Sequence, residues 1–342
     1  MTNTPLPSVL LGQAPSADRQ VIALSEGSDP RIVAGAIAAR SAGLADLILV
    51  GPRAEVEAEL TKQGANEDQG LMVHDPIDSQ FHTDFAAAFH ALRQHKGVTL
   101  EAASRAVQDP LVYAALLVRL GHAIGTVGGA VATTSDVVRT ALQVIGKAPD
   151  AAMVSSFFLM YPPEDATAGG RAMLYSDCGL VIDPSAEDLV AIACASAQSC
   201  QHLLQQPPRL AMLSFSTKGS AKHPKVTKVT EATEMLHAQR PDLSVDGELQ
   251  FDAAFAPEIG QRKAPGSSVA GAANVMIFPN LDAGNIGYKI TQRLGGYSAI
   301  GPILQGLAQP ANDLSRGCSA EDVLEMIAVT SLQASQATPT KQ

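Results

Sequence analysis

The sequence contains no tryptophan, and aromatic residues make up only 4% of its 342 residues. A surface that stacks nucleic-acid bases needs several aromatic side chains, so this kind of site is not expected. Positive charge is also scarce, because 24 Lys and Arg residues stand against 34 Asp and Glu residues and leave a net charge of -10. Nucleic acid and anionic membranes both bind basic surfaces. We therefore expect neither of them as a partner.

Cysteine and long apolar runs are scarce as well. The four cysteines form no C-x-x-C pair, which favours reduced thiols and a cytoplasmic protein over a disulfide framework. The longest uncharged stretch, residues 189–208, contains four glutamines and a histidine, so we expect no transmembrane helix. Residues 1–20 lack a continuous apolar region and predict an irregular lead-in without a secretory signal.

The sequence does contain enough apolar residues, 46%, for a large core, and its length suggests two domains. A buried strand at 21–24, a helix from Pro30 to about Gly43 and a strand at 47–50 follow one another, an order that predicts a parallel sheet. The alternation continues with helices expected at 81–94, 100–120, 135–146, 185–204 and 224–239, and strands at 123–131, 154–160, 172–181, 210–215 and 273–278. These patterns indicate an α/β protein.

Common motifs for zinc sites, nucleotide sites and hydrolase nucleophiles are missing. His82, His90 and His95 do not have the spacing of zinc ligands, and no Walker A, G-x-G-x-x-G or G-x-S-x-G sequence occurs. The glycine-rich turn at 125–129 is instead followed by hydroxyl residues at the start of a helix, which suggests an anion site. Arg139 lies one turn into this helix, where it could contribute to the anion site. Alternatively, it is a surface arginine that forms an ion pair with Asp136.

Two later segments carry candidate chemistry. Ser315, Arg316 and Asp322 supply a hydroxyl, a guanidinium and a carboxylate, which could orient, neutralise and deprotonate reactants. The alternative is structural, because Ser319 could cap a helix whose first turn contains Asp322. Cys318 is either a reactive thiol or a buried filler. Farther upstream, Lys289 and Arg293 lie at i and i+4 on one helical face, typical of a solvated face or of a site for an anion.

Several long runs then show a specific resemblance to the phosphate acetyltransferase family. In order along the chain they are DGELQFDAA at 246–254, PGSSVAG at 265–271, FPNLDAGNIGYK at 278–289, GPILQGL at 301–307 and NDLSRG at 312–317. The resemblance extends over the chain after the lead-in, and the length matches the short form of the family.

The resemblance implies reversible acetyl transfer between acetyl phosphate and coenzyme A (CoA), with CoA as a substrate, phosphate as a product and no tightly bound cofactor. It also implies a two-domain isocitrate/isopropylmalate dehydrogenase-like fold with parallel-rich sheets and an inter-domain active-site cleft. We place residues 1–150 and 302–342 in the first α/β domain and residues 151–301 in the inserted second domain. Members of the family are commonly homodimers.

Site residues follow from the matched motifs. Ser315, Arg316 and Asp322 match the catalytic segment of the family. The resemblance further implies substrate-binding roles for Arg93, Ser135, Arg139, Lys289 and Arg293, of which the last two would bind CoA. The chain departs from the family pattern at Ala132, where a histidine is usual, and at Ala272, where a lysine is frequent.

Alternatives within and outside this class remain open at this stage. A phosphate butyryltransferase or a broader acyltransferase would share the motifs. A dehydrogenase of the same fold would need a nucleotide site and metal-binding carboxylates, and the sequence shows neither pattern. A non-catalytic ligand-sensing module is disfavoured by the presence of Ser315, Arg316 and Asp322.

Overall fold

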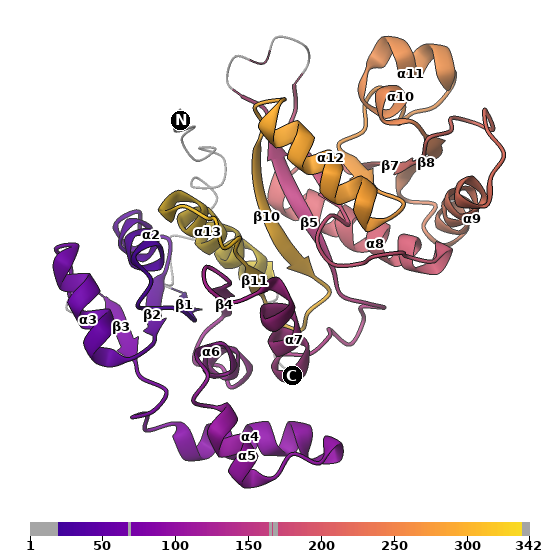
Figure 1. The fold of residues 1–342 in the computed structure, drawn as a ribbon. Coiled ribbons are helices and arrows are strands. Elements are labelled where there is room, and N and C mark those ends of the chain that lie inside the picture. The colour runs from indigo at the N-terminus through magenta and orange to yellow at the C-terminus, as the bar shows by residue number, and fades with distance from the viewer. Residues whose placement is uncertain (1–19, 68–69, 164–165, 167–169, 337–342) are drawn as a thin grey trace. The chain divides into compact units, whose positions relative to one another are not determined.

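Two units share the chain, and the sequence passes from one to the other and back. The computed structural model describes residues 20–67, 70–163, 166 and 170–336 (Figure 1). Residues 150–306 form one unit, which we call the inserted unit, and residues 20–149 with 307–336 form the other, the split unit. Residues 1–19 of the expected lead-in lie outside the described residues.

The return crossing lies after Gly306, whereas we expected it after residue 301. Strand β10 (Ser298–Gln305) continues past this point and stays paired with β5 (Ser155–Tyr161) to its last residue. Pro302 has no N–H to give to the ladder, and the register between the two strands shifts where it lies. The proline therefore interrupts the strand without ending it, and residues 302–305 belong to the inserted unit.

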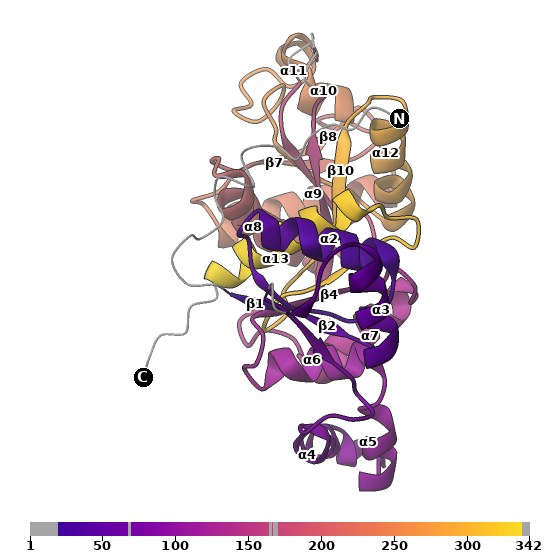
Figure 2. The same ribbon diagram turned by 90° about the vertical axis from the view of Figure 1, so that its left-hand side faces the viewer.

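The split unit contains a five-stranded sheet in which all neighbouring strands are parallel. In sheet order these are β11 (Ala311–Asp313), β4 (Gly125–Gly128), β1 (Val21–Leu24), β2 (Asp46–Val50) and β3 (Leu71–His74). Its helices are α2 (Pro30–Ser41), α3 (Arg53–Lys62), α4 (His82–Arg93), α5 (Leu100–Ala106), α6 (Pro110–Arg119), α7 (Thr134–Val144) and α13 (Ala320–Gln336). Helices α2 and α13 pack together over one face, and α6 covers the other (Figure 2). Burial on both faces explains the continuous apolar runs of β1 and β2.

Helix starts in this unit follow a repeated Asp-Pro signal. Asp29 caps α2 and Asp109 caps α6, and each is followed by a proline at the first helical position, where its missing N–H is not needed. The second of these signals corrects our expectation of one helix over 100–120. The chain there forms two helices, because Pro110 cannot continue α5 and begins α6 instead.

The inserted unit contains a six-stranded mixed sheet in the order β10, β5, β6 (Met173–Ser176), β9 (Val275–Ile277), β7 (Arg209–Leu213) and β8 (Ser244–Leu249). Strands β10, β5 and β6 pair in antiparallel fashion, and the remaining pairs are parallel. Its helices are α8 (Ala186–Ser199), α9 (Pro224–Gln239), α10 (Phe251–Phe255), α11 (Pro257–Lys263) and α12 (Leu281–Arg293). The prediction of an α/β protein with parallel-rich sheets is confirmed. Within the described ranges, no helix has both the length and the apolar character to span a bilayer.

Candidate active site

Three loops of the split unit meet at the carboxyl ends of β1, β4 and β11. These strands are adjacent and parallel, so the residues that follow them lie at the same edge of the sheet. The loops are residues 25–29, 129–133 and 314–319, and the last contains Ser315 and Arg316. Loops at this edge are the usual place for ligands in open α/β sheets, so we take them as the candidate site.

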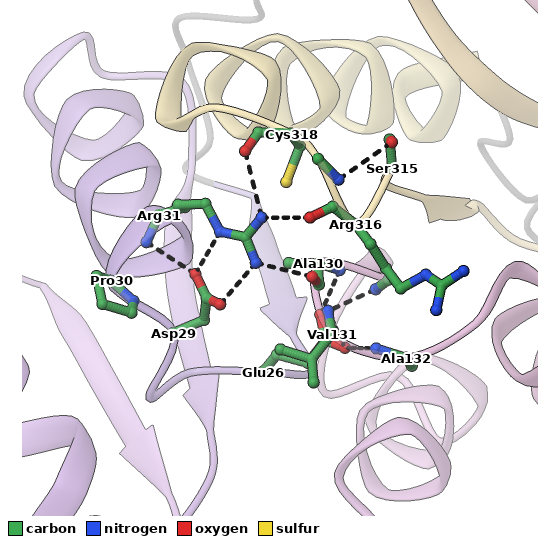
Figure 3. A network of polar contacts seen from close by, with 12 residues as sticks. Glu26, Asp29, Pro30, Arg31, Ala130, Val131, Ala132, Ser315, Arg316 and Cys318 are labelled. Carbon is green, nitrogen blue, oxygen red and sulfur yellow. Dashed lines mark hydrogen bonds and ion pairs between the residues drawn. The ribbon is translucent and has the colours of Figure 1, made fainter.

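A single carboxylate organises the glycine-rich loop. Glu26 accepts four backbone hydrogen bonds, from the N–H groups of Gly129, Ala130, Val131 and Ala132, at 2.7–3.0 Å (Figure 3). Gly129 has a φ of +103°, which a residue with a side chain would adopt only under strain. The N–H groups of this turn, where we expected an anion to bind, therefore bind an internal carboxylate. The first turn of α7 remains as a candidate anion site, because its leading N–H groups have no acceptor within the helix.

The guanidinium of Arg31 connects the three loops. Its five N–H donors are all used: Nε and Nη2 bind the Asp29 carboxylate, Nη2 also binds the carbonyl of Ala130 at 2.7 Å, and Nη1 binds the carbonyls of Arg316 at 2.7 Å and Cys318 at 3.3 Å (Figure 3). The hydrogen bond from Arg31 lowers the pKa of Asp29, whose side chain is only 12% exposed. A planar donor of this shape fixes the loops in one arrangement.

Ser315 and Arg316 present exposed side chains from this fixed backbone. The hydroxyl of Ser315 accepts the N–H of Gly317 at 3.3 Å. The carbonyl of Arg316 is bound by Arg31, while its own guanidinium extends out of the network (Figure 3). The structure therefore positions the backbone of Arg316 and leaves its charged end available for an anionic ligand.

Asp322 has the helix-capping contacts of the structural alternative. It lies in the first turn of α13, where its carboxylate accepts the N–H of Ser319 at 2.7 Å while the Ser319 hydroxyl accepts the N–H of Asp322 at 3.2 Å. This reciprocal pair is a capping box. The carboxylate is exposed, so it is not desolvated within the split unit. Its role as a base stays a prediction.

The remaining candidates of the split unit lie on two helices. Ser135 is exposed in the first turn of α7, and Arg139 on the same helix forms an ion pair with Asp136 between exposed side chains. This is the surface pair that the sequence allowed, and such pairs are weak enough for an anion to compete. Arg93 is the half-buried last residue of α4, a helix that packs against α7.

Lys289 and Arg293 belong to the inserted unit. Both are exposed on α12, which Asn280 caps by accepting the N–H of Ala283 at 3.0 Å. The Lys289 ammonium donates to Asn285 Oδ1 at 2.8 Å and lies 5.6 Å from the centre of the Tyr288 ring. The expected i, i+4 basic pair therefore exists on one helical surface.

Sequence reasoning missed three residues that hold the candidate site together: Glu26, Arg31 and Asp313. Acidic residues at the end of a strand were a usable signal, because Glu26 lies two residues after β1 and Asp313 is the last residue of β11. Asp313 is completely buried, and burial raises its pKa to about 7.

Within the described ranges, no group of three or more His, Cys, Asp or Glu side chains is placed to hold a metal ion.

Known proteins resemble this chain in sequence and in fold. A family model described as phosphate acetyl/butaryl transferase matches residues 9–331. A phosphate acetyltransferase of Paracoccus denitrificans is 49% identical over 322 residues, which cover 94% of this chain and 96% of the relative. The structure of a phosphotransacetylase from Streptococcus pyogenes has a TM-score of 0.90 and 43% identity, and the match covers 98% of this chain and 100% of that chain.

A more remote likeness concerns the fold alone. The 4-hydroxythreonine-4-phosphate dehydrogenase of Klebsiella pneumoniae has a TM-score of 0.53 at 12% identity, over 94% of this chain and 100% of that chain. The family match and the close relatives confirm the resemblance that the sequence runs indicated. The chain belongs to the phosphate acetyl/butaryl transferase family.

Proposed function

We propose that this protein catalyses the reversible transfer of an acetyl group between acetyl phosphate and CoA. The observation that carries the proposal is the identity of 49% with a phosphate acetyltransferase over 94% of the chain. The geometry of the split unit supports it, because the exposed hydroxyl of Ser315 and the guanidinium of Arg316 stand on a loop whose backbone is fixed by Arg31.

The proposed reaction is a direct transfer between the two bound substrates. A thiol is a weak nucleophile while it is protonated, so a base must take its proton. Asp322 would accept this proton, and the thiolate would attack the carbonyl carbon of acetyl phosphate. The bond from that carbon to the phosphate oxygen then breaks, and phosphate leaves with the electron pair.

Charge stabilisation would come from arginines. Negative charge develops on the carbonyl oxygen and on the departing phosphate, and a guanidinium matches phosphate oxygens with two parallel hydrogen bonds. Arg316, Arg139 and Arg93 would hold this charge, with Ser135 in the first turn of α7 as a further donor. Ser315 would form a hydrogen bond with the thiol or with the carbonyl oxygen, and Lys289 with Arg293 would bind the phosphates of CoA.

The finer assignments belong to the same proposal. The likeness to 4-hydroxythreonine-4-phosphate dehydrogenase supports an isocitrate/isopropylmalate dehydrogenase-like fold, with the two units as its domains. A homodimer is supported by the exposed apolar side chains of α12 and its end, namely Ile286, Ile290 and Leu294, which are 57%, 53% and 86% exposed. We also propose that the enzyme works in the cytoplasm with CoA as a substrate and no tightly bound cofactor.

Thioester formation tests the proposal. The purified protein is mixed with CoA and, in separate reactions, with acetyl, propionyl or butyryl phosphate, and the thioester is followed by its ultraviolet absorbance. We expect the highest kcat/KM with acetyl phosphate. Preference for butyryl phosphate would replace the proposal by a phosphate butyryltransferase, and the lack of thioester with every acyl phosphate would reject it.

A further inference from the structure

The carboxyl group of Asp313 lies where β11 passes into the loop of Ser315 and Arg316. Asp313 is the last residue of β11, lies opposite Gly128 of β4 and has an exposed fraction of 0%. A Cβ atom added to the neighbouring Gly129 would come within 2.2 Å of Asp313 Oδ1. The glycine therefore leaves the space that this carboxyl group occupies.

Thr134 is the hydrogen-bond partner of this carboxyl group. Its hydroxyl donates to Asp313 Oδ2 at 2.6 Å, whereas the buried Oδ1 makes no hydrogen bond within the described residues. Thr134 is the first residue of α7, and the helix continues through Ser135 to Arg139. One hydrogen bond thus links the helix of these two candidate residues to the loop of Ser315 and Arg316.

Burial places the ionisation of Asp313 in the neutral range. Desolvation is the largest cause that raises its pKa to about 7, the hydrogen bond from Thr134 lowers it, and the negative charge of Glu26 raises it further. Among the neighbouring elements, β4 contributes glycines and an uncharged Thr and Val, and Asp136 and Arg139 of α7 form an ion pair with each other. Helix α13 also packs on β11 and carries Glu321, Asp322 and Glu325.

We propose that Asp313 is a positioning residue for acetyl transfer, which holds the start of α7 and the loop of Ser315 and Arg316 in one arrangement through the hydroxyl of Thr134. The inference rests on the proposed function. A hydroxyl donates a stronger hydrogen bond to a carboxylate than to a neutral acid. The arrangement is therefore firmest when Asp313 is ionised, and turnover increases as the pH rises through about 7.

Three variants test this role. Asp313→Asn keeps the size of the side chain but removes its ionisation. Thr134→Val removes the hydroxyl and keeps the shape, and Thr134→Ser restores the hydroxyl. Thr140→Val, on the same helix, is the matched control because it makes the same Thr-to-Val change away from Asp313. For each protein kcat, both KM values and the melting temperature are measured from pH 5.5 to 9.

We expect Asp313→Asn to lower kcat about 10- to 100-fold, which is the range that a misplaced reacting group costs. The rise of kcat near pH 7 should be lost in this variant. Thr134→Val should lower kcat to a similar extent and also lose the rise, because the hydroxyl through which the ionisation of Asp313 acts is gone. Thr134→Ser and Thr140→Val should keep the wild-type profile. Carbon-13 NMR of the carboxyl group should show Asp313 titrating near pH 7 in the wild-type protein.

The outcomes separate the inference from the function. If the wild-type protein forms no thioester, the proposed function fails and the inference falls with it. If the wild-type protein is active but the variants keep the rise near pH 7 and lose turnover only in step with their melting temperatures, Asp313 is structural and the inference is wrong. Should Asp313→Asn fail to fold, the comparison of Thr134→Val with Thr134→Ser decides by the same criteria.

Discussion

Arg31 donates a hydrogen bond of 2.7 Å to the backbone carbonyl of Arg316, so one arginine positions the main chain of another. The two residues lie 285 positions apart in the sequence. The guanidinium of Arg31 donates hydrogen bonds to Asp29 and to three carbonyl groups, while the guanidinium of Arg316 extends out of this network and can bind an anion. The two arginines therefore have different tasks although they are neighbours.

Replacement of Arg31 by Lys should separate the effect of the positive charge from the effect of the hydrogen-bond geometry of the guanidinium. An ammonium can keep the ion pair with Asp29 but cannot reach all the carbonyls that the planar guanidinium binds. We expect the free energy of unfolding to fall by about 1–3 kcal/mol and kcat to fall about tenfold or more. Denaturant unfolding and the thioester assay measure the two effects. Arg105→Lys is the control, since Arg105 forms an exposed ion pair with Glu101 in the same unit. Wild-type turnover in Arg31→Lys would mean that other contacts suffice to place Arg316.

Asp322→Asn distinguishes a base from a helix cap. General-base catalysis contributes about 10²–10⁴-fold, so the base hypothesis predicts a loss of kcat in that range with nearly unchanged KM values. Higher pH should restore part of the rate, because more CoA is then already a thiolate. Ser319→Ala is the matched variant, as it breaks the same capping box and leaves the carboxylate. If both variants lose a little stability, about 0.5–2 kcal/mol, and similar small amounts of activity, Asp322 acts only as a cap.

Lys289→Gln and Arg293→Gln should weaken the binding of CoA selectively. If these exposed side chains bind its phosphates, the KM for CoA should rise more than the KM for acetyl phosphate. Added salt should have the same selective effect in the wild-type protein, because exposed charges are screened. Lys225→Gln, which changes another exposed lysine of the inserted unit, should alter neither KM value. Equal increases for both substrates would remove the assignment of this helical face to CoA.

Glu325 should make the stability of the fold dependent on pH. It is 7% exposed on α13, and its pKa is raised to about 8 by burial, with the charges of Asp322 and Glu321 adding to the effect. Because the folded state holds the proton more tightly than the unfolded state, this group's contribution to stability is lost as the pH rises from about 4.5 through 8.

Glu325→Gln should therefore reduce the decrease of the melting temperature between pH 5 and pH 8. The contribution of Glu325 to the pH dependence of the free energy of unfolding approaches about 1.4 kcal/mol per pH unit in the middle of this range. Asp313 acts in the same direction, so part of the dependence should persist. Glu234→Gln, an exposed residue of α9, serves as the control. A wild-type slope retained in Glu325→Gln would show that another group titrates.

Much of the fold could be predicted because the signals were local. The Asp-Pro start of α2, the apolar runs of β1 and β2, and the start of α8 at its Ser185 cap depend on neighbours in the sequence. The break before Pro110 was also local and was missed. The short strand β11 and the continuation of β10 past Pro302 depend on pairing with distant strands, which periodicity does not report.

The candidate side chains could be named from the sequence, whereas the contacts that position them could not. Motifs named the exposed side chains of Ser315, Arg316 and Arg139, whose spacing along the chain is fixed. The residues that support them act over long separations, as Glu26 does toward Gly129 and Arg31 toward Arg316. Contacts between strand ends that are adjacent only in the folded sheet leave no periodic pattern, so these residues appeared only in the structure.

The carboxylate of Glu26 is a permanently tethered occupant of the loop from Gly129 to Ala132. A tethered group is present at a very high effective concentration, so we expect the carboxylate to compete well with phosphate in solution for these N–H groups. The four hydrogen bonds hold the loop in one shape without a ligand, so we expect little binding energy to be consumed in ordering it. Under the proposed function, the acyl phosphate would then be bound by the first turn of α7 and by exposed side chains, and the side chains can be exchanged one at a time without rebuilding this loop.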